Sequence, residues 1–164
     1  MSDSRPIGIF DSGLGGLTVL NAIKKIIPNE NIIYVGDTAR VPYGNKSAPL
    51  IVQYSLQITQ FLLEKDAKLI IVACNTASAL AISTLQNDFD LPIIGVIAPG
   101  VNSAVKLTKN NNVGVIGTNA TISSNAYQNE LIKISPSIYT LSQACPLFVP
   151  LVEEGLLEGP IVSA

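Results

Sequence analysis

Short runs of consecutive apolar residues alternate along the chain with longer segments in which apolar residues recur every three or four positions. The first pattern is typical of strands buried on both faces of a sheet, and the second of amphipathic helices. Strands are expected at 7–10, 31–37, 69–73, 91–97, 113–117 and 137–141. Their alternation with helices predicts an α/β protein with parallel sheets.

Between the expected strands, apolar side chains form helical stripes. Leu17, Leu20 and Ile23 lie on one such stripe, and Pro28 ends the helix. Further helices are expected at 51–62, 76–86, 101–107, 118–134 and 146–159. Helices that follow strands in this way cover the faces of a parallel sheet.

The pattern restarts near residue 98. "IGIFDS" (7–12) and "VGVIGT" (113–118) are both strands with glycine second and a hydroxyl residue at the end. This likeness predicts two related α/β units, a first domain at 1–97 and a second at 98–164, with the active-site cleft between them. The second unit has only two expected strands, few for an independent sheet, so we expect it to be incomplete.

The composition narrows the classes of function. Of the 164 residues, 48% are hydrophobic and 13% are charged, and the net charge is −2, so no nucleic-acid surface is expected. The polar N-terminus lacks the apolar run of a signal peptide, and no apolar run is long enough for a membrane span. The sequence therefore predicts a soluble, cytoplasmic protein.

The chain has no histidine and two cysteines, which restricts metal and redox chemistry. Cys74 and Cys145 lack the spacing of metal ligands, so no metal site is expected. One disulfide between them is formally open, although the composition is not that of a disulfide-stabilised secreted domain.

Polar residues follow several expected strands at the point where each strand ends. These are Asp11 and Ser12, Asp37 and Thr38, Cys74 with Asn75 and Thr76, and Thr118 of the second unit. Ligands of parallel α/β sheets bind beyond the carboxyl ends of the strands. We therefore expect these side chains to meet at one cleft.

Two loops near this edge contain glycines. "DSGLGG" (11–16) precedes a helix as phosphate-binding loops do, but it lacks the G-x-G-x-x-G spacing, and Asp11 would repel a phosphate. A nucleotide site is thus the weaker interpretation, and a tight turn the simpler one. In "RVPYG" (40–44), Tyr43 and the backbone N–H of Gly44 are candidates for holding a carboxylate, although turn residues would suffice.

Cys74 has two interpretations. Free cysteines are often small core residues. However, Cys74 closes a strand and starts a helix, and a helix start lowers a thiol pKa, so we expect it to be more reactive than Cys145 at neutral pH. Without histidine, its thiolate fits a general base that removes a proton next to a carboxylate, with Asp11 assisting proton transfer.

Five segments together resemble the glutamate racemases of the cofactor-independent aspartate/glutamate racemase family. They are "GIFDSGLGGLTVL", "YVGDTARVPYG", "ACNTASA", "GVIGTNATISSNAY" and "ACPLFVPLVEEG". The resemblance covers essentially the whole chain in the expected order. It implies an isomerase that interconverts L- and D-glutamate without pyridoxal phosphate or metal. It also implies that D-glutamate is supplied for peptidoglycan, and so for the cell wall and cell shape.

The resemblance also implies roles for individual residues. Cys74 corresponds to one of the family's two catalytic cysteines, with Asp11 as its catalytic partner. The implied substrate-binding residues are Asp11, Ser12, Tyr43, Gly44, Asn75, Thr76 and Thr118. Asp37 and Glu153 match acidic residues that assist. The implied partner is the small-molecule substrate, with no nucleic acid and no membrane, and a homodimer is one assembly that fits.

The sequence departs from the family in one respect. The family's second catalytic cysteine lies in a later Cys-Thr-His motif that this chain lacks, and Cys145 lies in a different motif, so we interpret it as structural. The chain is therefore expected to be a truncated form. Racemisation needs an acid–base group on each face of Cα, so the chain alone is expected to be inactive.

Two further functions stay open from the sequence. One is racemisation of aspartate or another small acid, because the preferred side-chain length is not readable from the residues. The other is a catalytically inactive module that binds a dicarboxylate.

Overall fold

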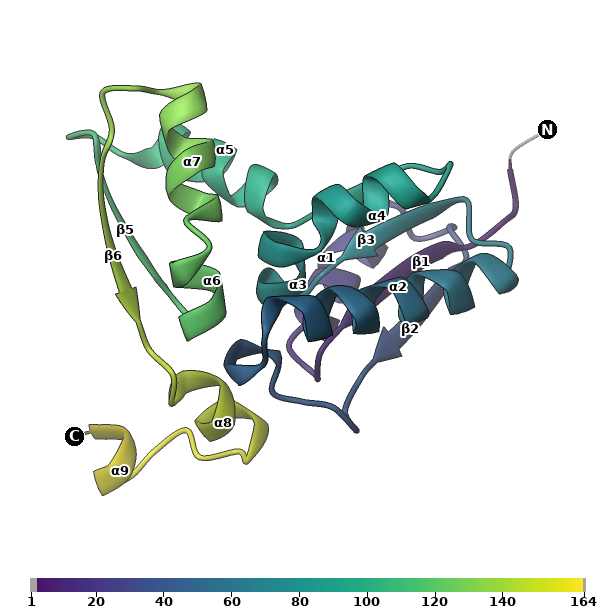
Figure 1. The fold of residues 1–164 in the computed structure, drawn as a ribbon, viewed down its shortest axis with the longest axis horizontal. Helices are drawn as coiled ribbons and strands as arrows, with labels where there is room; N and C mark the ends of the chain where they lie inside the picture. The colour runs from purple at the N-terminus through teal and green to yellow at the C-terminus, as the bar shows by residue number, and fades with distance from the viewer. Residues whose placement is uncertain (1–2, 164) are drawn as a thin grey trace.

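The computed structural model describes residues 3–163, which form two parallel β-sheets with helices packed on them (Figure 1). The larger sheet has the strand order β2-β1-β3-β4. Its strands are β1 (Ile7–Asp11), β2 (Ile32–Gly36), β3 (Leu69–Val72) and β4 (Ile93–Gly95). All its pairings are parallel, so the predicted α/β class is confirmed.

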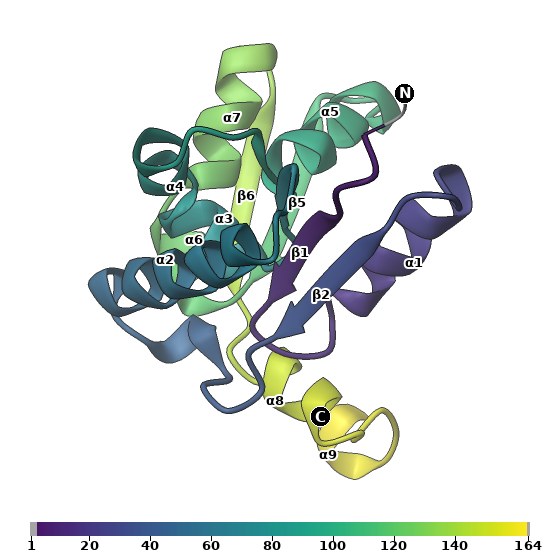
Figure 2. The same ribbon diagram turned by 90° about the vertical axis from the view of Figure 1, so that its right-hand side faces the viewer.

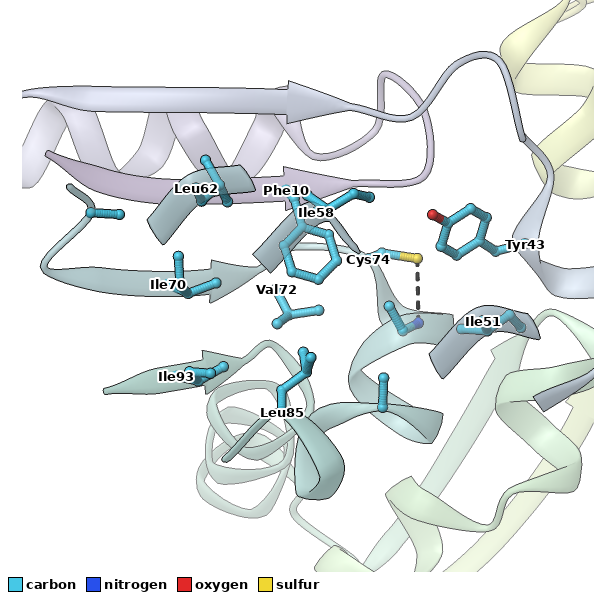
Figure 3. Packing of buried hydrophobic residues seen from close by; sticks show 13 residues of the cluster. Phe10, Tyr43, Ile51, Ile58, Leu62, Ile70, Val72, Cys74, Leu85 and Ile93 are labelled. Carbon is cyan, nitrogen blue, oxygen red and sulfur yellow. Dashed lines mark hydrogen bonds between the residues drawn. The ribbon is translucent and has the colours of Figure 1, made fainter. Parts of the chain in front are cut away.

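Helices cover both faces of this sheet, with α1 on one side and α2 and α4 on the other (Figure 2). The helices of this unit are α1 (Leu17–Ile26), α2 (Ala48–Glu64), α3 (Asn75–Leu80) and α4 (Ile82–Asp88), with the short 3-10 helix η1 (Tyr43–Asn45) before α2. The alternation of side chains along β1 decides the face: Phe10 packs toward α2, whereas Ile9 packs toward α1. Figure 3 shows the core on the α2 side.

The second unit is built on the two-stranded parallel sheet of β5 (Asn112–Gly117) and β6 (Tyr139–Ala144). Its helices are α5 (Ile97–Leu107), α6 (Asn119–Ser123) and α7 (Ala126–Ile134). Val101, Val115 and Leu131 form its core between α5, β5 and α7. Ile116 and Leu141 on the sheet are exposed. This unit is followed by α8 (Phe148–Glu153) and α9 (Pro160–Ser163).

Several element boundaries differ from the sequence prediction. The helix expected at 118–134 is two helices, because Asn125 adopts a left-handed conformation (φ 55°) between them. The strand expected at 91–97 is shortened to Ile93–Gly95, because Val96 is already in the helical region before α5. The last strand runs over 139–144 rather than 137–141.

The two sheets share no strand pairing within residues 3–163 and are connected through α5. The domain boundary predicted between residues 97 and 98 coincides with the first turn of α5. The division into two domains stays a prediction. In the described part of the chain, no helix is both long and apolar enough to cross a membrane.

Candidate active site

A cavity of about 350 Å³ lies where the carboxyl ends of β1 and β3 meet the second unit and α8, and we call it the cleft. Asp37 and Thr38, which were also expected there, are not among the residues that line it, but eight predicted site residues are: Asp11, Ser12, Tyr43, Gly44, Cys74, Asn75, Thr76 and Thr118. The first seven come from the larger sheet's unit, and Thr118 comes from the end of β5. The topology of parallel strands is the reason for this convergence, since their carboxyl ends lie at one edge.

Asp11 forms the turn between β1 and α1. Its Oδ2 accepts hydrogen bonds from the backbone N–H groups of Gly13 (3.1 Å) and Gly16 (3.0 Å). Gly16 has to be glycine here, because a Cβ would lie 2.5 Å from Cβ of Asp11. These two N–H groups are the ones that a phosphate-binding loop would offer to its ligand. Because Asp11 occupies them, the turn does not form a phosphate cradle.

Cys74 lies at the start of α3 and is only 5% exposed. Its sulfur accepts a hydrogen bond from the Ala77 N–H at 3.4 Å, drawn in Figure 3, and its thiol donates to Ser12 Oγ at 3.4 Å. Burial raises the pKa of the Cys74 thiol, and the carboxylate of Asp11 raises it further; the hydrogen bonds with Ser12 and Ala77 lower it by less.

The expectation of a lowered Cys74 pKa was therefore wrong: the Ala77 N–H at the helix start does lower it, but the net shift is upward. Burial and the Asp11 charge disfavour the thiolate. The hydrogen bonds with Ser12 and Ala77 favour it, but by less. In the ligand-free cleft the sulfur is a neutral thiol. It can donate a proton as it stands, but it has to lose its proton before it can act as a base.

Tyr43 is held in the wall of the cleft by a buried carboxylate. Its ring is 1% exposed and its hydroxyl, which points toward Cys74 in Figure 3, donates to Asp37 Oδ2 at 2.5 Å. Arg40 neutralises Asp37, with Nε at 2.6 Å from Oδ2. Burial, and then the Asp37 carboxylate, raise the pKa of Tyr43, so the phenol stays protonated. Asp37 itself is not among the residues that line the cleft.

The two units touch at Gly44 and Thr118. A Cβ on Gly44 would overlap the side chain of Thr118, so the close contact requires glycine. Thr118 also joins a triangle of hydroxyl groups with Thr76 and Thr121, with oxygen separations of 2.9, 3.0 and 3.2 Å. This triangle links the starts of α3 and α6 beside the cleft.

The sequence pointed to Glu153 of α8, which lines the cleft, but the apolar wall that this helix contributes was missed. Phe148, Val149 and Val152 line the cleft with apolar groups, and Glu153 accepts a hydrogen bond from the Leu14 N–H at 3.3 Å. The helical spacing of 146–159 predicted a longer helix than the six-residue α8, and it did not indicate which surface the helix would cover. Cys145, by contrast, is partly exposed and is not among the described residues that line the cleft.

The fold and the site place the protein among α/β proteins with a cavity at the strand ends of two parallel sheets. Residues 7–155 match the Asp/Glu/Hydantoin racemase family, and the chain belongs to this family.

Relatives and solved structures agree on the branch of the family that the chain resembles. It is 52% identical over 157 residues to a glutamate racemase of Geobacter metallireducens, covering 96% of this chain and 58% of that protein. It is 55% identical over 155 residues to that of Aquifex aeolicus, covering 94% of this chain and 60% of the relative. The chain thus spans about 60% of the length of these relatives.

Among solved structures, the glutamate racemase of Bacillus anthracis has a TM-score of 0.94 at 40% identity, covering 99% of this chain and 61% of that one. The glutamate racemase of Francisella tularensis in complex with D-glutamate has a TM-score of 0.91 at 48% identity, covering 98% of this chain and 60% of that one.

Proposed function

We propose that this chain forms the part of a cytoplasmic glutamate racemase that binds glutamate and exchanges its α-proton at Cys74. Its product, D-glutamate, would serve peptidoglycan synthesis. The observation that carries the proposal is the enclosure of the Cys74 thiol in a small cleft with Asp11, Asn75 and Thr76. The names of the relatives support glutamate as the substrate, and the D-glutamate complex of the Francisella tularensis protein supports a glutamate-sized ligand. The proposal involves no cofactor.

The ligand's charged groups have distinct partners in the cleft. The amide N–H groups of Asn75 and the hydroxyls of Thr76 and Thr118 are donors for a carboxylate, and the backbone N–H of Gly44 adds another. Tyr43 uses its proton on Asp37, so its oxygen is left as an acceptor. Tyr43 therefore fits the ligand's ammonium group better than a carboxylate, as does the carboxylate of Asp11.

In the proposed reaction the thiol of Cys74 first gives up its proton, and the Cα–H bond then breaks as its proton moves to the sulfur. The electron pair stays on Cα and is shared with the adjacent carboxylate, whose negative charge the surrounding donors stabilise. An entering ammonium group brings positive charge into the cleft, which favours the thiolate over the thiol. Asp11 accepts the proton that the thiol loses.

Inversion requires a second acid on the opposite face of Cα. Within residues 3–163, Cys74 is the single thiol that lines the cleft. We therefore expect the chain to exchange the α-proton on one face without racemising glutamate at the rate of a two-base enzyme. Aspartate is the alternative substrate to glutamate. A homodimer is the assembly to examine in the same experiments.

A second candidate is a dicarboxylate-binding module without turnover. The observation that favours it is the neutral state of Cys74, since burial and Asp11 both raise its pKa. Such a module would bind glutamate but leave its α-proton in place.

Deuterium incorporation tests these proposals. The chain, confirmed by mass, is incubated in D₂O with L-glutamate, D-glutamate, aspartate or ATP, and deuterium at Cα and optical rotation are followed. We expect incorporation into glutamate that the Cys74→Ala variant lowers by ~10²–10⁴-fold, and that the control Cys145→Ala leaves unchanged. Binding of glutamate without incorporation would favour the inactive module. Binding of ATP alone would overturn both proposals.

A further inference from the structure

A tyrosine outside the cleft forms a hydrogen bond with the side chain of Asn75. The hydroxyl of Tyr127, on α7 of the second unit, donates a hydrogen bond to Asn75 Oδ1 at 2.5 Å across 52 residues of sequence. Asn75 is the first residue of α3, directly after Cys74, and it lines the cleft. Tyr127 is not among the residues that line it. The bond therefore reaches the cleft from behind.

The ring of Tyr127 is itself fixed. It packs against the core of the second unit, next to Gly100 of α5, whose Cβ position lies at van der Waals distance (3.7 Å) from Cε1 of the ring. Burial raises the pKa of Tyr127, so its hydroxyl keeps its proton and remains a donor. In the structure this hydroxyl donates to Oδ1 of Asn75, which sets the orientation of the amide.

The choice of atom matters because the two ends of an amide have opposite hydrogen-bonding character. Oδ1 accepts, whereas Nδ2 carries two N–H donors. Among residues 3–163, Tyr127 is the one hydrogen-bond partner of the Asn75 side chain. When its donor holds Oδ1, Nδ2 is left for the cleft. A flipped amide would present its carbonyl oxygen there, which repels a carboxylate.

We propose that Tyr127 is a positioning residue that fixes the Asn75 amide with its N–H groups toward the carboxylate of the ligand. This inference rests on the proposed function for the identity of the ligand, an α-amino dicarboxylate. It also gives the contact between α7 and α3 a role in binding, because a shift of the second unit would release the Asn75 amide.

The test is Tyr127→Phe, which removes the hydroxyl and keeps the ring. We expect the dissociation constant for D- and L-glutamate, measured by calorimetry, to rise about tenfold. This is the contribution of one hydrogen bond to a charged group, here the bond from the Asn75 amide to the ligand carboxylate. In the deuterium-exchange assay KM should rise similarly with little change in kcat, as for lost ground-state binding. The control is Tyr139→Phe, at a 65% exposed tyrosine of the same unit, which should match the wild type.

A double-mutant cycle separates positioning from general stability. In an Asn75→Ala background, Tyr127→Phe should have little further effect on glutamate affinity, because the amide it orients is gone. A full tenfold loss in that background would overturn the proposal, since Tyr127 would then act by another route.

A ligand-free measurement keeps the inference separate from the proposed function. The side-chain amide signals of Asn75 in ¹⁵N NMR should report a rigid group in the wild type and in Tyr139→Phe, and a mobile one in Tyr127→Phe. Unchanged amide signals in Tyr127→Phe would overturn the positioning role. A rigid amide in a wild type that binds no glutamate would support positioning and reject glutamate as the ligand.

Discussion

The chemistry of Cys74 depends on its immediate neighbours. Its position after a strand and before a helix is visible in the sequence and by itself suggests a reactive thiolate. In the structure the same thiol is 5% exposed, lies near the Asp11 carboxylate and has a raised pKa. Its thiolate fraction at neutral pH is therefore low.

This reverses the reactivity order expected from the sequence. At neutral pH we expect Cys145, which is partly exposed, to react with iodoacetamide faster than Cys74, because Cys74 is buried and its raised pKa lowers its thiolate fraction. Peptide mass mapping of the time course measures both rates, and the urea-unfolded chain, where both cysteines are exposed, is the control. Faster labelling of Cys74 would show that its thiolate is stabilised after all.

At the scale of elements, the turn between β1 and α1 combines a structural and a chemical task in one residue. Asp11 accepts two backbone hydrogen bonds within the turn, and it also lines the cleft beside Cys74. The glycines around Asp11 permit this tight turn. Glu153 of α8 binds the turn by accepting a hydrogen bond from the Leu14 N–H. A single substitution of Asp11 would therefore change both stability and chemistry.

Two substitutions of Asp11 separate these tasks. Asp11→Ala removes both acceptor interactions, so we expect the free energy of unfolding to fall by about 2 kcal/mol or more. Asp11→Asn keeps an oxygen for the two N–H groups and removes the charge, so stability should fall less while α-proton exchange falls by ~10²–10⁴-fold. Urea unfolding and deuterium incorporation are the measurements. If Asp11→Asn exchanges the α-proton at the wild-type rate, the role of Asp11 is limited to forming the turn.

At the scale of the whole molecule, the cleft exists because the two units are held in close contact. Gly44 packs on Thr118, the hydroxyls of Thr76, Thr118 and Thr121 form a triangle, and Tyr127 reaches Asn75. Each of these contacts joins the larger sheet's unit to the second unit. Displacing one unit would therefore separate Thr118 from the other proposed ligand-binding residues.

Gly44→Ala tests this contact. The added methyl group would overlap Thr118, so we expect the free energy of unfolding to fall by about 1–3 kcal/mol, as for other overpacked contacts, and glutamate affinity to fall with it. The matched control is Gly114→Ala, because a Cβ there meets nothing within 4 Å, and its stability should stay within about 0.5 kcal/mol of the wild type. Equal stability of the two variants would mean that the units do not pack rigidly at Gly44.

Local sequence patterns were sufficient for the α/β class, the order of the strands along the chain and most of the polar residues at the cleft. Apolar runs and helical stripes are local, and parallel strands bring their carboxyl ends to one edge whatever the details of packing. The convergence of Asp11, Cys74 and Thr118 therefore follows from their positions at strand ends in the sequence. Boundaries such as the break at Asn125 were missed, because a left-handed residue within a helical pattern leaves no periodic signal.

How these residues behave depends instead on tertiary contacts. The sign of the Cys74 pKa shift depends on burial and on Asp11. Whether Tyr43 can donate to a ligand depends on its bond to Asp37, and the orientation of the Asn75 amide depends on Tyr127. Burial, charge and hydrogen bonding act through space over a few ångströms, between residues as far apart in the chain as Asn75 and Tyr127. A linear pattern does not record those distances, so the residue types at the cleft were predictable and their protonation and orientation were not.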